Sequence, residues 1–186
     1  IFPGDDSGPD GGTNTDSGAA VLFVSGSLQR VLKAPNVGAG DAFGASVAVA
    51  NDNWRCNGDN WCTSFCQTMA CGTSHNVRLV IGAPFEDSAS LTVSPMGPTD
   101  ETAQNSGAAY VFDGTPFMLS PIAYLKRPTA QAGANFGASV SISRRWGAIA
   151  VGAPNDASGA MGISTGVAGI TAASTDATMP AAGWCR

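Results

Sequence analysis

The chain of 186 residues is long enough to bury one substantial core, but only 12% of its residues are charged. Its net charge of −5 argues against nucleic acid or an anionic membrane as partner, since both are polyanions, and no apolar run approaches the roughly 20 residues that span a bilayer. Glycine (24) and proline (11) are abundant, whereas Leu, Lys and Glu are scarce. This composition favours strands and turns over helices.

The first predicted elements are short strands separated by turns. The opening residues, IFPGDDS, align with GAPFEDS at 82–88, so we expect the chain to begin inside a repeat unit. SGAAVLF at 17–23 and LQRVLKAP at 28–35 are two predicted strands, and FGASVAVA at 43–50 is a third. These segments have no sustained helical spacing with cap signals, so an all-β unit is expected.

The next segment, residues 51–76, is predicted to be a loop inserted at a hairpin tip. It contains a dense group of cysteines: Cys56, Cys62, Cys66 and Cys71. We favour disulfides, and hence an oxidising compartment, because the spacing C-x5-C-x3-C-x4-C fits a zinc knuckle poorly. Three disulfide pairings remain open, and zinc with His75 is the alternative.

The strand VRLVIGAP at 77–84 follows, and then the same order of segments repeats. SGAAYVF at 106–112, PIAYLKRP at 121–128, FGASVSIS at 136–143 and AIAVGAP at 148–154 are the second set. The segment TGVAGI at 165–170 begins a further unit. Unit boundaries are therefore expected near residues 18, 107 and 166, with residues 171–186 a linker or the start of the next unit.

The recurring Phe-Gly and Gly-Ala-Pro positions have a structural interpretation. Glycine at a strand start or end suits a positive φ or the close approach of another backbone. Proline ends a strand because it donates no ladder hydrogen bond. We expect Phe43 and Phe136 to pack in the core between neighbouring sheets. A ligand-stacking aromatic is the alternative.

The motifs Phe43-Gly44, Gly82-Ala83-Pro84, Phe136-Gly137 and Gly152-Ala153-Pro154 resemble the FG-GAP repeat. This repeat is the blade of the β-propeller in integrin alpha subunits and many bacterial surface proteins. The resemblance covers residues 1–170 and implies blades of four antiparallel strands, about three of them here. Since propellers close with four to eight blades, we expect a fragment of a longer chain or an assembly of copies.

Many blades of this family carry a calcium loop between the FG and GAP strands, which the resemblance suggests looking for here. After Phe43, the candidate oxygen ligands are Asn51, Asn53, Asn57 and Asp59. Arg55 stands where a third carboxylate is expected, which opposes a cation. The alternative is an asparagine-rich turn held by disulfides. The second repeat has Arg144 and Arg145 in the corresponding loop, so no calcium is expected there.

Two groups of side chains are candidates for contacts with a partner. Trp54 and Trp61 lie in the cysteine-rich insert, and aromatic side chains make good anchors unless they pack over the disulfides. Acidic residues recur in the loops between GAP and SGAA, where they either bind a basic partner or calcium, or act as solvated turn-formers. In the second such loop these are Glu86, Asp87, Asp100 and Glu101.

The sequence offers little for catalysis, since His75 is the sole histidine and no nucleophile, phosphate-loop or zinc-protease motif occurs. We therefore expect a non-enzymatic, extracellular or cell-surface propeller segment for adhesion or protein interaction. Its partner would be a protein or glycan ligand, or further copies or blades of the parent chain. The alternatives are a structural subunit of an extracellular filament or coat, and an accessory domain of a larger secreted enzyme.

Overall fold

The computed structural model describes residues 15–51, 77–90, 95–143 and 148–157. Every regular element in these ranges is a strand, so the expectation of an all-β chain is confirmed there. The strands are β1 (Ala20–Val24), β2 (Ser27–Leu32), β3 (Ser46–Asn51), β4 (Val77–Ala83), β5 (Ala108–Thr115), β6 (Met118–Leu125), β7 (Ser139–Ile142) and β8 (Ile149–Gly152).

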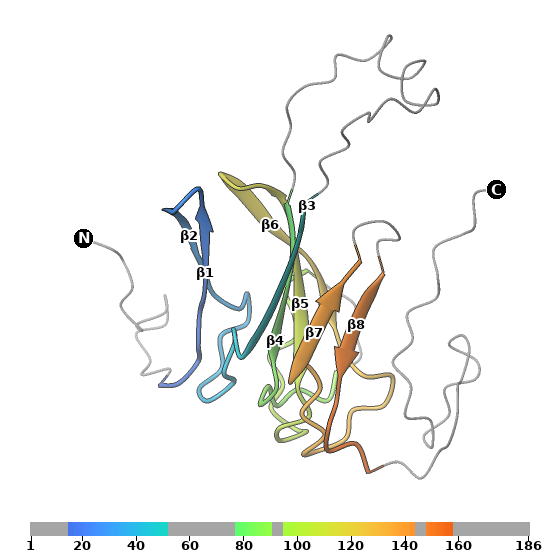
Figure 1. The fold of residues 1–186 in the computed structure, drawn as a ribbon. Coiled ribbons are helices and arrows are strands. Elements are labelled where there is room, and N and C mark those ends of the chain that lie inside the picture. The colour runs from blue at the N-terminus through green and yellow to red at the C-terminus, as the bar shows by residue number, and fades with distance from the viewer. Residues whose placement is uncertain (1–14, 52–76, 91–94, 144–147, 158–186) are drawn as a thin grey trace, which may run out of the picture.

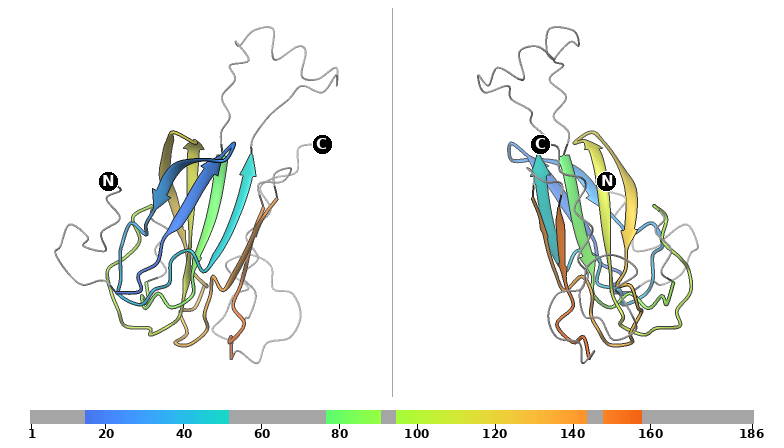
Figure 2. Two further views of the ribbon diagram at one scale, coloured as in Figure 1. Left: turned by 60° about the vertical axis from the view of Figure 1, so that its left-hand side comes forward. Right: turned by 90° about the vertical axis from the view of Figure 1, so that its right-hand side faces the viewer.

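The strands form three antiparallel sheets, which follow one another in chain order (Figure 1). β1 and β2 make a two-stranded sheet, β3-β4-β5-β6 make a four-stranded central sheet, and β7 and β8 make a second two-stranded sheet. Two further views show the small sheets on opposite faces of the central sheet (Figure 2). The described residues thus contain one complete set of four strands and no closed ring.

Two hydrophobic clusters fill the spaces between the sheets. The first lies between β1–β2 and the central sheet and contains Phe43 and Tyr110. The second lies between the central sheet and β7–β8 and contains Phe136 and Val80. Both phenylalanines are almost fully buried, which confirms their predicted place in the core between neighbouring sheets.

The central sheet does not begin at the same strand as the repeat unit expected from the sequence. That unit starts at SGAA, whereas the central sheet starts at the FG strand β3 and ends at β6. The expected boundary near residue 107 therefore falls between β4 and β5, which pair along their full length. The reason is that the loop from β4 to β5 returns the chain antiparallel to itself, whereas the segment from β6 to β7 carries it to the next sheet.

Each sheet is joined to the next by a backbone contact that we call the SGA–FG lock. Gly18 forms a parallel bridge with Phe43, and Gly107 forms the same bridge with Phe136. The amide of each phenylalanine donates to the carbonyl of the serine before the bridged glycine, Ser17 or Ser106, at 2.9 and 3.0 Å. Both junctions between sheets are therefore built in the same way.

Glycine is required in the lock because two backbones meet without space for a side chain. Gly107 has φ +80°, and a Cβ there would collide with the carbonyl of Phe136. Gly44 and Gly137 also have positive φ, as expected for the FG glycines. Gly82 instead meets the backbone of Gly137, so at this position close approach is the reason for glycine.

Gly107→Ala should lower the free energy of unfolding by about 2–4 kcal/mol, through left-handed strain and the clash with Phe136. Gly133→Ala is the matched control, since Gly133 has φ +76° with nothing within 4 Å of a Cβ. The control should lose only about 1 kcal/mol from the φ term. Urea unfolding followed by circular dichroism measures both, and equal losses would contradict the lock.

Candidate functional site

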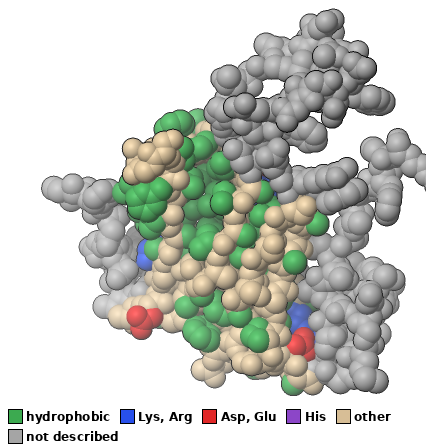
Figure 3. Space-filling model, viewed as in Figure 1, with side chains coloured by type: hydrophobic (Ala, Val, Ile, Leu, Met, Phe, Trp, Pro, Cys, Tyr) green, Lys and Arg blue, Asp and Glu red, His purple; other side chains and the backbone are tan. Residues whose placement is uncertain are grey.

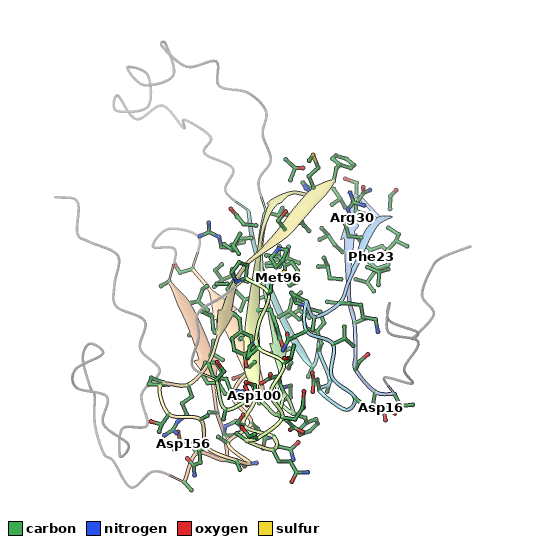
Figure 4. All side chains as sticks on the ribbon, turned by 180° about the vertical axis from the view of Figure 1, so that it is seen from behind. Asp16, Phe23, Arg30, Met96, Asp100 and Asp156 are labelled. Atoms are coloured by element: carbon green, nitrogen blue, oxygen red, sulfur yellow. The ribbon has the colours of Figure 1, made fainter. Side chains whose placement is uncertain are left out.

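A connected group of polar side chains lies at one end of the central sheet, around the loop that joins β4 to β5. We call residues 84–90 and 95–107 the rim loop. Asp100 lies at this end, far from Phe23 and Arg30 at the other end (Figure 4). The SGA–FG lock between Gly107 and Phe136 lies at the same end, because it begins where the rim loop ends.

Two carboxylates fix the path of the rim loop. Asp87 accepts a hydrogen bond from the amide of Asn105 at 2.6 Å. Asp100 accepts from the Ser88 hydroxyl, from the amide of Ala89 at 2.8 Å and from the Thr102 hydroxyl at 2.7 Å. These donors, Ser88 first, hold the pKa of the Asp100 carboxyl well below its usual range. Asp100 therefore acts as the anionic centre of a turn.

A buried ion pair anchors the rim loop to the end of β6. The Lys126 ammonium bonds the Glu86 carboxylate, and both side chains are almost completely excluded from solvent. The Tyr124 hydroxyl donates to the same carboxylate oxygen at 2.9 Å. Burial lowers the pKa of Lys126, and the charge of Glu86 opposes that shift. The pair therefore compensates charge that would otherwise be costly to bury.

Asn36 lies in the segment between β2 and β3, and its side chain connects that segment to the cluster around Glu86 and Lys126. Its side-chain amide donates to the carbonyl of Pro98 at 2.7 Å, and its oxygen accepts from the Tyr110 hydroxyl at 2.8 Å. Burial, followed by the charge of Glu86, raises the pKa of Tyr110 and of Tyr124 far above the usual value. Both phenols therefore stay protonated and serve as hydrogen-bond donors.

Asp41 is the second buried acid of this cluster. Its carboxylate accepts from the amide of Gly38 at 3.1 Å, and its side chain is almost fully buried. Burial, with the negative charges of Glu86 and Glu101, raises the pKa of Asp41 to about 7. The corresponding position of the second repeat is Ala134, so this acid belongs to one junction alone.

A second buried ion pair joins the central sheet to the end of β8. Asp156 aligns with Glu86 after the GAP motif, and it pairs with Arg127, the residue after Lys126. Arg127 also donates to the carbonyl of Thr129 at 2.7 Å. The Glu86 pair therefore lies within the central sheet, whereas the Asp156 pair joins that sheet to β7–β8.

The four acidic residues predicted for partner contacts have different environments. Glu86 is buried in the ion pair, Asp87 and Asp100 are part-buried and fix the loop, and Glu101 is exposed. Partial desolvation of its carboxyl, followed by the negative charges of Asp87 and Glu86, raises the pKa of Glu101. Glu101 is therefore the member of this group that is displayed to solvent.

The other predicted site residues remain a prediction, because nearly all of them lie outside the described part of the chain. Asn51 is the last residue of β3. The remaining candidates lie outside the described residues, namely Asn53, Asn57, Asp59, Trp54, Trp61, His75 and the four cysteines Cys56, Cys62, Cys66 and Cys71. Within the described ranges, no three His, Cys, Asp or Glu side chains converge as a metal site would require.

The residues of this cluster that were not predicted from the sequence are Asp41, Asn36, Lys126 and the two tyrosines. A signal for Lys126 was available, since it follows directly on the apolar strand PIAYL, where a cation needs a buried partner. Asp41 could have been noticed as the acid that replaces Ala134 between the repeats. No pattern in the sequence indicates that these residues meet Glu86.

Comparison with known proteins leaves the resemblance to the FG-GAP repeat as a prediction. No family model matches the chain, and neither the curated proteins nor the solved structures contain a match. A search of the described residues finds no helix suited to crossing a bilayer.

Lys126→Met should destabilise the protein by about 3–5 kcal/mol, because Glu86 would remain buried without its cation. Adding Glu86→Gln removes that charge, so the double variant should recover much of the loss. Unfolding free energies of the four chains in a double-mutant cycle measure the coupling. Additive losses would contradict the pair as the anchor of the loop.

Asp41→Asn should remove a pH dependence of stability. Because the folded pKa of about 7 lies above the unfolded value of 3.8, the wild-type free energy of unfolding falls as the pH rises between these values. The variant should match the wild type near pH 4 and exceed it by roughly 4 kcal/mol at pH 8. Urea unfolding across this range measures the difference, and parallel curves would contradict the assignment.

Proposed function

We propose that the chain is a segment of an FG-GAP-type β-propeller in which the three sheets are successive blades. The SGA–FG lock supports this proposal, because the same pairs of motifs join the sheets at both junctions. A complete blade is the four-stranded central sheet, which agrees with the antiparallel blade of this architecture. β1–β2 then match the last two strands of a blade, and β7–β8 match the first two.

We further propose that this segment acts outside the cell as a non-enzymatic platform for adhesion or protein interaction, with a protein or glycan ligand. The polar cluster at the rim carries this proposal. Lys126 and Tyr124 both bond the buried Glu86 carboxylate, and these contacts hold the loop in place. Such an arrangement gives a rigid loop on a rigid sheet, as binding surfaces often require.

The platform has two candidate contact surfaces at opposite ends of the central sheet. The rim loop presents Glu101 at one end. Residues 52–76 link β3 to β4 at the other end, since β3 ends and β4 begins there. Clustered cysteines in this link support an extracellular location.

A link-exchange variant tests this function. Residues 52–76 are replaced by residues 144–147, which join the equivalent strands β7 and β8, so the sheets should still form. Wild-type protein and variant are applied to a glycan array and to an array of secreted proteins. We expect the wild type to bind a defined set that the variant loses.

A second variant, Glu101→Lys, tests the rim for a basic partner. Circular dichroism must show that both variants keep the strand signal. Binding by wild type that neither variant changes would contradict both contact surfaces, and a wild type that binds nothing on either array would contradict the adhesion function.

The alternative of a filament or coat subunit is favoured by one specific observation, the exposed apolar side chains on β1–β2. The alternative of an accessory domain in a secreted enzyme has no such observation in its favour.

A further inference from the structure

The face of β1–β2 that points away from the central sheet is apolar and exposed. Val21, Phe23 and Val31 are 49%, 60% and 47% exposed. Their counterparts in the second repeat are Tyr110, Phe112 and Tyr124, which are all buried because β1–β2 covers them. Figure 3 shows hydrophobic side chains gathered over this part of the surface. The face therefore has the composition of a junction between sheets without a neighbour among the described residues.

A second exposed group lies on β3, on the side that faces β1–β2. Val47 and Val49 are 54% and 61% exposed. Their repeat counterparts Val140 and Ile142 are partly buried, because β7 packs against β3 and β4 of the central sheet. Val47 and Val49 are exposed because, among the residues that the structure describes, the sheet they face consists of β1 and β2.

The two small sheets are complementary halves of one four-stranded sheet. β7 and β8 repeat the sequence and pairing of β3 and β4, and β1 and β2 repeat those of β5 and β6. In the complete sheet, β4 pairs with β5. The edges that correspond to this pairing belong to β8 and β1, and neither pairs with another strand in the described part of the chain. The competing partner for β8 is residues 165–170, which align with SGAAYVF and lie outside the described residues, and a monomeric protein would favour it.

We propose that a second copy of this chain completes the sheet, its β8 pairing antiparallel with β1 of the first copy. The proposal rests on the blade assignment above. The register follows from the central sheet, where Ile81 lies opposite Tyr110. Val151 of one copy then lies opposite Val21 of the next.

This single docking mode covers both exposed groups. The second copy's β7 lies over Val47 and Val49, as β7 lies over β3 and β4 within one chain. Its central sheet then faces Val21, Phe23 and Val31. Burial of large apolar side chains stabilises such an interface, and pairing removes two open sheet edges.

The contact is head-to-tail, so it uses different surfaces on the two copies. The described part of each chain then contributes one complete central sheet and two half-sheets, which amounts to two blades. Such contacts repeat until a ring closes, or continue as a filament. Rings of two to four copies fall within the roughly four to eight blades that propellers use.

Sedimentation velocity over a range of protein concentrations tests the association. Wild-type chain should form multimers, whereas Val49→Lys and the double variant Val21→Lys/Phe23→Lys should sediment as monomers with an unchanged strand signal. Phe85→Asn is the control, since Phe85 is exposed on the rim loop and its counterpart is Asn155. A monomeric wild type, or lysine variants that still form multimers, would overturn the proposal.

A cysteine pair tests the register. Residues opposite each other in antiparallel strands bring their Cα atoms to about 4.5–5.5 Å, within reach of a disulfide. Under mild oxidation, Val21→Cys/Val151→Cys should give a ladder of linked multimers that neither single variant nor wild type gives. Linked dimers from Val21→Cys alone would show a symmetric contact and overturn the head-to-tail arrangement.

These experiments distinguish a failure of the self-association proposal from a failure of the ligand-binding proposal. Val49→Lys protein that is monomeric but still binds on the arrays supports self-association as a feature added to ligand binding. A wild type that is monomeric yet binds on the arrays rejects the second copy and keeps the interaction function. A wild type that forms multimers but binds nothing keeps the assembly and rejects the ligand.

Discussion

The structure depends on the close approach of two backbones at each junction between sheets. Gly18 meets Phe43 and Gly107 meets Phe136 through parallel bridges, with glycine at the point where a Cβ would collide. A contact of this kind sets the distance between neighbouring sheets before any side chain is considered. The phenylalanine of each FG pair then fills the space that the contact defines, and it is buried at both junctions.

The polar cluster is a consequence of the same geometry. The lock brings the end of one sheet against the loop that leaves the next, so charged residues near the loop ends become buried. Lys126 offsets Glu86 within the central sheet, and Arg127 offsets Asp156 at the junction with β7–β8. Buried pairs contribute little net stability but are costly to break, so they act mainly to fix the loops in one arrangement. Asp41 has no equivalent at the second junction, and the raised pKa reports its crowded, negative surroundings.

Exposed apolar residues follow from where each sheet is incomplete. Side chains that are buried in the central sheet become exposed in β1–β2, although the sequence positions correspond. The difference lies in the neighbouring sheet and not in the residue, because burial depends on what covers a face. An apolar face with an open edge favours pairing with another strand of matching register. This links the fold to assembly and to the adhesive role proposed for the chain.

The sequence by itself determined the class of structure and its repetition. Recurring FG, GAP and SGAA segments fixed the strands, the turns and the burial of Phe43 and Phe136, because alternation and glycine placement act locally. Tertiary structure alone decided the frame of the sheets and the meeting of Asp41, Asn36, Glu86 and Lys126. These residues lie far apart in the chain, and their contact depends on which strands pair and how closely two sheets approach. Neither the pairing of the strands nor the spacing between the sheets is encoded in a local sequence pattern.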